Sequence, residues 1–418
     1  MDLFMLSEKC FTGTVLFYLA ATVLYLIHMG WRNRVLGGTA TAAAITGVGF
    51  HTFGLALRWL QAGFHHPPFT NMYESLLFFA WGIALFYVII EWKYKLRIAG
   101  AFIFPIALGG MGAAVLSGDK QIEQLVPALQ SNWLHAHVAI ASLAYAAFVA
   151  SFGLSLMYLI KDRVGRERIG AAAAFMVTVL LAICDKFQVL LGNFRMDNLQ
   201  AETTGDKFIS FPLPGRLLLA GLIFSGVAGI LYLAAPEAGA KPAESKGSWP
   251  RLILLLGFLF TAAGLAALIS QVGHNEATRL FSNPFKIVII MLAVLTAGGM
   301  LILDYKYDSI AEALPAADFL DHLSYLSVMI AYPLMTAVII TGAVWANYAW
   351  GTYWSWDPKE TASLITWLIY TLYLHARITA NWTGRPVALI SIIGFVSVVF
   401  TFLGVNILLS GLHSYGSA

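Results

Sequence analysis

Long runs of apolar residues, separated by short polar segments, make up most of the chain. A helix that crosses a bilayer needs about 20 mostly apolar residues, and about 12 runs reach that length. The run at 169–190 is the weakest, because Asp185 and Lys186 lie near one of its ends. The pattern predicts an all-α fold, a polytopic helical bundle in a membrane with about 12 transmembrane helices. The predicted spans are residues 12–30, 38–57, 73–91, 98–117, 134–160, 169–190, 216–235, 251–272, 285–303, 323–345, 360–376 and 387–410.

The lysines and arginines are distributed unevenly over the loops between these spans. One alternate set of loops carries 15 of the 25 positively charged residues, and by the positive-inside rule these loops face the cytoplasm. Both termini then lie outside, as does the aromatic segment 346–359. We therefore expect any chemistry on the outer face. The 15 residues are Arg32, Arg34, Lys93, Lys95, Arg97, Lys161, Arg163, Arg166, Arg168, Lys241, Lys246, Arg251, Lys306, Arg377 and Arg385.

The composition excludes several classes of protein. Hydrophobic residues make up 59% of the 418 residues and charged residues 11%, against about 25% charged in ordinary soluble domains. This excludes a soluble enzyme, and a net charge of +3 is too balanced for a protein that binds nucleic acid. The two cysteines, Cys10 and Cys184, form no C-x-x-C motif, so a redox role would require a bound cofactor. The N-terminus lacks the features of a cleaved signal peptide, and we expect the first apolar run to be retained as a span.

Four of the twelve tryptophans lie within one outer segment, WANYAWGTYWSWDPKE. A belt of aromatic residues at the membrane surface is one explanation, but belt residues are spread around a protein at one depth. A dense group of flat rings instead favours a large flat ligand, through stacking and apolar burial. A porphyrin fits that description. The four residues are Trp345, Trp350, Trp354 and Trp356.

The same segment ends in a signal for the start of a helix. Asp357 suits the N-cap position, Pro358 the first helical position, and Glu360 the acidic position of a capping box. We expect Asp357 to cap the next helix rather than to act in catalysis. It would thereby fix the point where the tryptophan segment meets the membrane.

Three of the ten histidines are candidate ligands of haem iron. His137 lies at the outer start of the span 134–160, and His413 lies just beyond the outer end of the last span. His375 lies near the inner end of the span 360–376. Neutral imidazole is a common axial ligand of haem. We expect His137 and His413 to hold a haem beside the tryptophans, and His375 to belong to a second, inner site.

The other histidines have weaker cases. His28, at the inner end of the first span, is one possible partner for His375, and a residue of another protein is the alternative. His65 and His66 are possible further ligands in an outer loop, whereas His135 is two residues from His137 and should point in another direction on a helix. An interhelical hydrogen bond explains a single histidine in a span equally well. That explanation is preferred for His51, His274 and His322.

Several motifs, taken together, point to a family. The tryptophan segment has the form WAN-x-AWG-x-YW-x-WDPKE, and it is followed along the chain by LITW, YLHAR, GVN and GLHSYG. Two earlier segments add to these motifs: LVPALQSNWLHAHVAIASLAYAAF, and GLALRW with NMYES. In these motifs the chain resembles the CcsA/ResC family of cytochrome c biogenesis proteins. The resemblance covers residues near 50–160 and 320–416. The tryptophan segment alone also occurs in other haem-handling membrane proteins, whereas GLHSYG and YLHAR narrow the match.

The resemblance implies a function in the bacterial cytoplasmic (inner) membrane. Haem b would be the transported substrate, presented on the periplasmic face for attachment to the C-x-x-C-H motif of apocytochrome c. A CcsB/ResB-type membrane protein would be the partner, and the chain a subunit of a cytochrome c synthase complex without catalytic side chains of its own. By motif, His137 and His413 match the outer haem ligands, and His375 matches a transmembrane ligand. The tryptophans and Asp357 belong to the cofactor-binding motif.

Two further implications concern the route of haem. We expect haem to enter at His375 and to move to the outer site between His137 and His413. The second ligand at the inner site usually belongs to the CcsB-type protein, which disfavours His28. Arg377 either faces a propionate there or extends to the inner membrane surface.

The chain divides into three predicted segments. Residues 1–164 and 316–418 carry the family motifs, with His137 in the first and the tryptophans, His375 and His413 in the second. Residues 165–315 look like an insertion relative to a shorter pattern of about eight spans. The insertion has no role that the sequence identifies, and its even number of spans preserves the orientation of the tryptophan segment.

Two other classes of protein fit parts of the pattern. A 12-span secondary transporter should show interrupted helices at matching places in two halves, which the sequence lacks. A b-type electron-transfer subunit should hold both ligands of each haem at membrane depth. His137 and His413 lie instead at the ends of spans.

Overall fold

The computed structural model describes residues 3–63, 66–117, 131–164 and 305–405, together with residue 122 and short stretches between 193 and 303. The chain forms two compact units, one of residues Met1–Arg163 with Tyr305–Ala418 and one of residues Val164–Asp304. The predicted insertion 165–315 shares most of its residues with the second unit.

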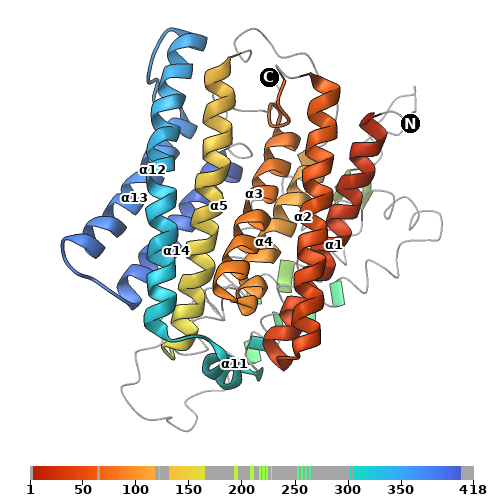
Figure 1. Cartoon of the computed structure of the whole chain (residues 1–418), viewed down its shortest axis with the longest axis vertical. Helices are drawn as coiled ribbons and strands as arrows, with labels where there is room; N and C mark the ends of the chain where they lie inside the picture. Colours follow the sequence, from red (N-terminus) through yellow and green to blue (C-terminus); the bar gives the residue numbers. More distant parts are fainter. Residues whose placement is uncertain are drawn as a thin grey trace. The chain divides into compact units, whose positions relative to one another are not determined.

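The first unit is built from long helices that follow the predicted spans (Figure 1). The helices are generally longer than the predicted apolar runs, because polar residues continue the helix beyond each run. The helices are α1 (Leu3–Trp31), α2 (Arg34–Ala62), α3 (Met72–Tyr94), α4 (Gly100–Ser117, preceded by the 3-10 turn Arg97–Ala99), α5 (Asn132–Lys161), α11 (Tyr307–Ala313), α12 (Ala317–Trp350), α13 (Pro358–Ile378) and α14 (Arg385–Val399, continued by the π-helical turn Phe400–Gly404).

Among the described residues, seven helices are long and apolar enough to cross a membrane. They are α1 to α5, α12 and α14, with α4 and α14 counted together with their adjoining turns. α13 matches the predicted span 360–376 but is more polar. This confirms a polytopic helical membrane protein. The total of about 12 spans remains a prediction, because the spans predicted between 169 and 303 fall mostly outside the described residues.

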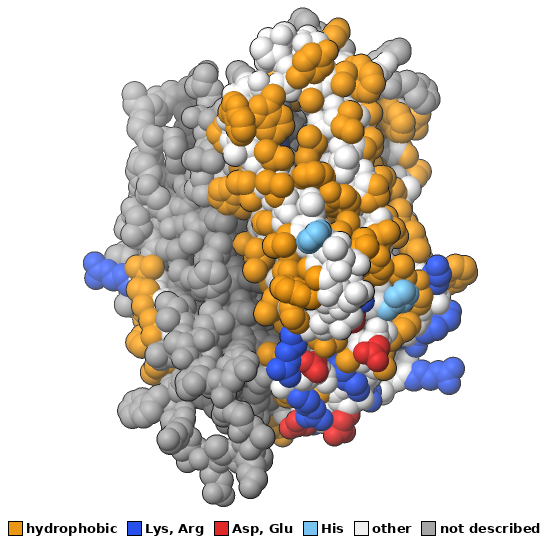
Figure 2. Space-filling view, turned by 90° about the vertical axis from the view of Figure 1, so that its left-hand side faces the viewer, with side chains coloured by type: hydrophobic (Ala, Val, Ile, Leu, Met, Phe, Trp, Pro, Cys, Tyr) orange, Lys and Arg blue, Asp and Glu red, His pale blue; other side chains and the backbone are white. Residues whose placement is uncertain are grey.

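Short connections make successive helices antiparallel, so the ends of the helices gather at two ends of the first unit (Figure 1). We call the end where α12 stops and α13 starts the tryptophan end. The opposite end, which holds Arg32, Arg97, Arg163 and Arg385, is called the basic end. Figure 2 shows charged side chains gathered toward one end of the described face, below a largely hydrophobic surface.

α5 is the most buried of the candidate spans, with 83% of its apolar window inside the protein. Small and aromatic side chains hold it against α12, α13 and α14. The hydroxyl of Ser151 bonds those of Ser324, at 2.9 Å, and Ser391, at 2.8 Å. The rings of Phe148 and Tyr370 are stacked with centroids 3.7 Å apart. Such interhelical hydroxyl bonds and close ring contacts are typical of membrane bundles, where lipid provides no hydrophobic drive between helices.

The second unit contains a pair of short strands, which the all-α prediction did not include. β1 (Asn193–Arg195) pairs antiparallel with β2 (Phe208–Ser210), and Phe194 lies opposite Ile209. Short helical stretches are described near 216–227 and 252–264.

Candidate functional site

A cleft opens at the tryptophan end between α3, α5, α12 and α13. The space between these elements amounts to about 790 Å³, a volume that includes the part open to the surroundings. One wall is apolar, formed by side chains of α5 and α12 and by Phe402 of the π-helical turn. The polar and aromatic lining includes His137, Tyr145, Trp354, Lys359, Glu360 and Ser363.

His137 is held in one orientation by a neighbouring helix. Its Nδ1 lies 2.8 Å from the carbonyl oxygen of Val338 on α12. Because a carbonyl only accepts, Nδ1 carries the proton, and in the neutral ring the lone pair is on Nε2. The ring also stacks on Trp345, with centroids 6.4 Å apart and planes at 27°. A hydrogen bond to one imidazole nitrogen is the usual way in which proteins orient the other nitrogen toward a metal.

The backbone of α12 passes very close to this ring at Gly342. A Cβ at position 342 would lie 2.8 Å from Cε1 and 3.0 Å from Nδ1 of His137. Glycine is therefore required for the observed ring position, although alanine is the better helix former.

We expect Gly342→Ala to displace the His137 ring while the helix stays intact, and to weaken ligand binding in the cleft by about 10-fold or more, as disturbed ligand orientation does at metal sites. Titration of the purified protein with haem measures the effect. Gly49→Ala is the matched control, because no atom lies within 4 Å of a Cβ there. Equal binding by both variants would contradict the close contact at Gly342.

The four tryptophans form two pairs rather than one platform. α12 continues to Trp350, so both Trp345 and Trp350 lie on a helix. The prediction that 346–350 belong to a loop was therefore wrong. The helix ends at Gly351, whose φ of +74° suits glycine. Trp345 and Trp350 contact each other with centroids 4.9 Å apart. Trp354 lines the cleft. The ring of Trp356 contacts the ring of Trp354, with centroids 5.8 Å apart, but Trp356 is 70% exposed. Trp345 supports His137 from behind, being only 4% exposed.

The predicted capping box at the start of α13 is confirmed. The side chain of Asp357 accepts the N–H of Lys359 at 2.9 Å, and the Glu360 carboxylate accepts the N–H groups of Asp357 at 3.3 Å and Ser355 at 2.8 Å. These bonds bring the chain into α13 directly after the tryptophans. Trp356 has a φ of +59°, an uncommon value for a bulky side chain. The loop is thus held in a specific shape at the mouth of the cleft.

Lys359 is the lysine that lines the cleft. Burial lowers the pKa of its ammonium group to about 8, and the carboxylate of Asp357 partly offsets this shift. The lysine precedes the predicted span 360–376 and remains mostly protonated at pH 7. Lys359 was not among the residues predicted for the site. Its position two residues after the capping Asp357 is the sequence signal that places it at the tryptophan end.

His375 lies on α13 toward the basic end and is exposed. Two neighbours on the same side of the helix, Leu368 and Leu372, are also exposed, at 51% and 55%. Arg377 does not extend to solvent as an isolated charge, because it pairs with Asp321 at 2.5 Å and lies over the ring of Tyr325. The structure therefore gives Arg377 a role in joining α13 to α12.

The remaining histidine candidates are placed as follows. His413 and His65 lie outside the described residues. His28 bonds the carbonyl of Asn33 through Nδ1 at 3.0 Å, within the turn between α1 and α2. α1 and α2 pack on each other, whereas α13, which carries His375, packs on α12 and α14. His135 is near Phe69 at 6.2 Å, whereas His137 faces α12, so the predicted difference in direction is confirmed.

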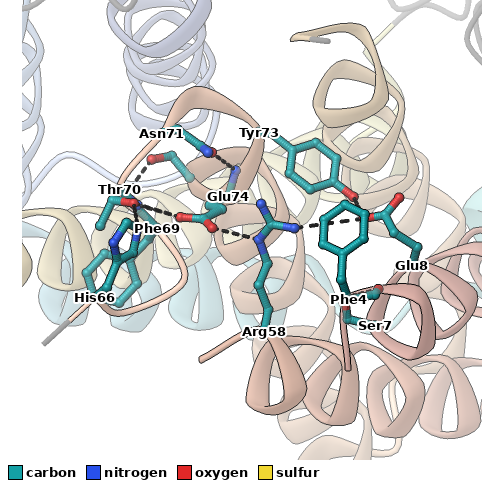
Figure 3. Close-up of polar contacts among 11 residues, drawn as sticks. Phe4, Ser7, Glu8, Arg58, His66, Phe69, Thr70, Asn71, Tyr73 and Glu74 are labelled. Carbon is teal, nitrogen blue, oxygen red and sulfur yellow. Dashed lines mark hydrogen bonds and ion pairs between the residues drawn. The ribbon is translucent and has the colours of Figure 1, made fainter. Parts of the chain in front are cut away.

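His66 belongs to a buried polar network at the tryptophan end (Figure 3). The Glu74 carboxylate accepts hydrogen bonds from Arg58 Nε at 2.6 Å and from the N–H and hydroxyl of Thr70 at 3.0 and 2.8 Å. Because the Thr70 hydroxyl donates to Glu74, it accepts from His66 Nε2 at 2.7 Å. The network anchors the loop between α2 and α3, and Ser75 next to Glu74 lines the cleft.

Known proteins are similar to this chain over most of its length. Residues 69–413 match the Cytochrome C assembly protein family. The Cytochrome c biogenesis protein CcsA of Trichormus variabilis is 34% identical to this chain, over 87% of this chain and 84% of its own length. The protein of the same name in Nostoc sp. is 35% identical over the same shares. The CcsA protein of Gloeobacter violaceus is 34% identical over 95% of this chain and 92% of its own. The chain belongs to the CcsA family of cytochrome c assembly proteins.

Proposed function

We propose that this protein is the membrane component of cytochrome c biogenesis that presents haem for covalent attachment to the C-x-x-C-H motif of apocytochrome c. The observation that carries the proposal is the geometry of His137. Its Nδ1–H is bonded to the Val338 carbonyl, so Nε2 is the nitrogen suited to iron, in a cleft beside the tryptophan pairs. The family membership supports the same function.

The residues of the cleft fit haem b as a substrate. Trp354 and the apolar wall suit the porphyrin faces, and Lys359 offers a cation for a propionate carboxylate. His137 would supply one axial ligand and His413 the other. Trp345 would act indirectly, by holding the His137 ring.

The reaction itself requires orientation rather than a catalytic side chain. Each thiol of the apocytochrome adds across a vinyl group of haem, so that one C–S and one C–H bond form while the S–H bond and the π bond of the vinyl group break. The nucleophiles belong to the substrate, and holding reactants in the right geometry supplies much of the acceleration. The histidine of the C-x-x-C-H motif would then replace an outer ligand and carry haem away.

The basic end is proposed to face the cytoplasm of a bacterial inner membrane, by the positive-inside rule. The tryptophan end and both termini would then face the periplasm. The exposed side of α13 around His375 would meet a CcsB/ResB-type partner, which would supply the second ligand of an inner haem. Residues 165–315 would add further spans.

The spectrum of the purified protein tests this function. We expect a haem absorption band that grows when a CcsB-type partner is co-expressed, and a loss of roughly half of the bound haem in His375→Ala, since one of two proposed sites is removed. His322→Ala is the matched control, because His322 is also exposed near the basic end, on α12.

Two results would contradict the proposal. Absence of haem even with the partner would rule out haem handling. Bound haem together with normal maturation of c-type cytochromes in cells that lack the protein would favour a b-type electron-transfer subunit.

A further inference from the structure

A straight stripe of half-buried side chains runs along α13 from the cleft to His375. Glu360, Leu364, Trp367, Thr371 and His375 are spaced at i, i+4, i+7, i+11 and i+15, which places them on one side of a helix. The first four are half-buried and His375 is exposed. Neighbouring side chains therefore cover this stripe only in part.

α12 presents a matching stripe. Tyr332, Thr336, Ile339 and Ala343 follow the spacing i, i+4, i+7 and i+11, and all four are half-buried. Ile339 and Ala343 line the cleft. The two stripes thus form a continuous seam between α12 and α13 that begins in the cleft and extends toward the basic end.

Four side chains close this seam at its middle. Tyr332 and Trp367 are stacked, with centroids 5.7 Å apart and planes at 22°. The indole N–H of Trp367 donates to the hydroxyl of Thr336 at 2.9 Å, and the hydroxyls of Tyr332 and Thr371 are 3.0 Å apart. All of these contacts cross from one helix to the other. We call these four residues the latch.

The latch lies about midway between the two proposed haem positions. At about 1.5 Å per residue, Trp367 is about 10 Å along the axis from Glu360 and about 12 Å from His375. Pro333, next to Tyr332, lies inside α12 and cannot donate the usual helical hydrogen bond. This locally weakens α12 at the level where the seam would have to widen.

We propose that the seam between α12 and α13 is the passage for haem from His375 to the His137 cleft, and that the latch closes it at the midpoint. The inference rests on the proposed function. Haem in passage would contact Trp367 and Tyr332 after their two interhelical hydrogen bonds break. The flat rings of the latch offer the same stacking surface to a porphyrin that they offer to each other.

The double variant Tyr332→Phe with Thr336→Val tests the latch, because it removes both interhelical hydrogen bonds and preserves side-chain shape. Dithionite-reduced haem is mixed with the purified complex of this protein and its CcsB-type partner, and absorbance is followed in time. We expect a first phase for binding at His375 and a second, slower phase that is absent in His137→Ala. The second phase should be about 10-fold faster in the double variant, as expected for two hydrogen bonds of modest net strength.

Thr39→Val is the matched control, since the Thr39 hydroxyl bonds a carbonyl of its own helix, α2, in the described contacts. A normal amplitude of the first phase verifies that a variant is folded. If the double variant loses that phase, Thr336→Val alone is compared with Thr39→Val. An unchanged rate of the second phase would overturn the latch. Absence of bound haem in the unaltered complex would overturn the proposed function instead.

Discussion

Replacing His137 with alanine should nearly abolish the maturation of c-type cytochromes. The change removes the proposed axial ligand at the point where haem is presented. Changes to residues that only orient a metal ligand already cost about 10–100-fold in affinity, so we expect a loss of more than about 100-fold for the ligand itself. Haem staining of cytochromes c in cells, and haem titration of the purified variant, measure the two consequences.

His135→Ala is the control for this experiment. His135 lies on the same helix two residues earlier and faces Phe69 rather than α12. We expect cytochrome maturation close to normal in that variant. If His135→Ala lost maturation while His137→Ala kept it, the ligand assignment would be wrong, and the tautomer fixed by Val338 would have only a structural role.

Local signals in the sequence predicted the features that depend on neighbours along the chain. The capping box at Asp357 and Glu360 follows from residue types at fixed spacing, and the structure confirms it. The different directions of His135 and His137 follow from helical geometry alone. The candidate spans that fall on described helices were found from apolar run length.

Contacts between distant segments could not be predicted in this way. Trp350 was assigned to a loop because the predicted span ends at residue 345, yet the helix continues until Gly351 permits a left-handed backbone. The role of Trp345 behind His137 depends on how α5 packs on α12, about 200 residues apart in the chain. The same holds for Lys359 in the cleft and for the seam residues Tyr332 and Trp367.

The buried ion pair of Arg58 and Glu74 is the strongest example of such a contact (Figure 3). The sequence places Arg58 just beyond one predicted span and Glu74 near the start of the next, and it contains no signal that the two side chains are buried together. In the structure both side chains have 0% exposure, and Arg58 Nε lies 2.6 Å from Oε1 of Glu74. The Arg58 guanidinium also lies over the ring of Tyr73 at 5.1 Å and 3.9 Å from Glu8 of α1.

Removing Arg58 should destabilise the protein by about 3–5 kcal/mol, because the Glu74 carboxylate is then left buried without its counter-ion. Removing Glu74 should cost less, because Glu8 still lies 3.9 Å from the Arg58 guanidinium. We expect Arg58→Ala to lower the free energy of unfolding in mixed detergent micelles by about 3–5 kcal/mol and Glu74→Ala to lower it by less. Both variants should give a reduced yield of folded protein. Arg163→Ala, which breaks the exposed pair with Asp308, should cost at most about 1 kcal/mol.

The double variant Arg58→Met with Glu74→Gln separates the cost of a buried unpaired charge from the loss of packing. Glutamine keeps an oxygen that accepts from Thr70, and methionine fills part of the arginine volume without a charge. Replacing both members of a buried ion pair is often far less costly than removing one, so the double variant should recover a large part of the stability lost in Arg58→Ala. If it is instead as unstable as the sum of the single changes, the pair contributes through packing and hydrogen bonds, and the charges themselves matter little.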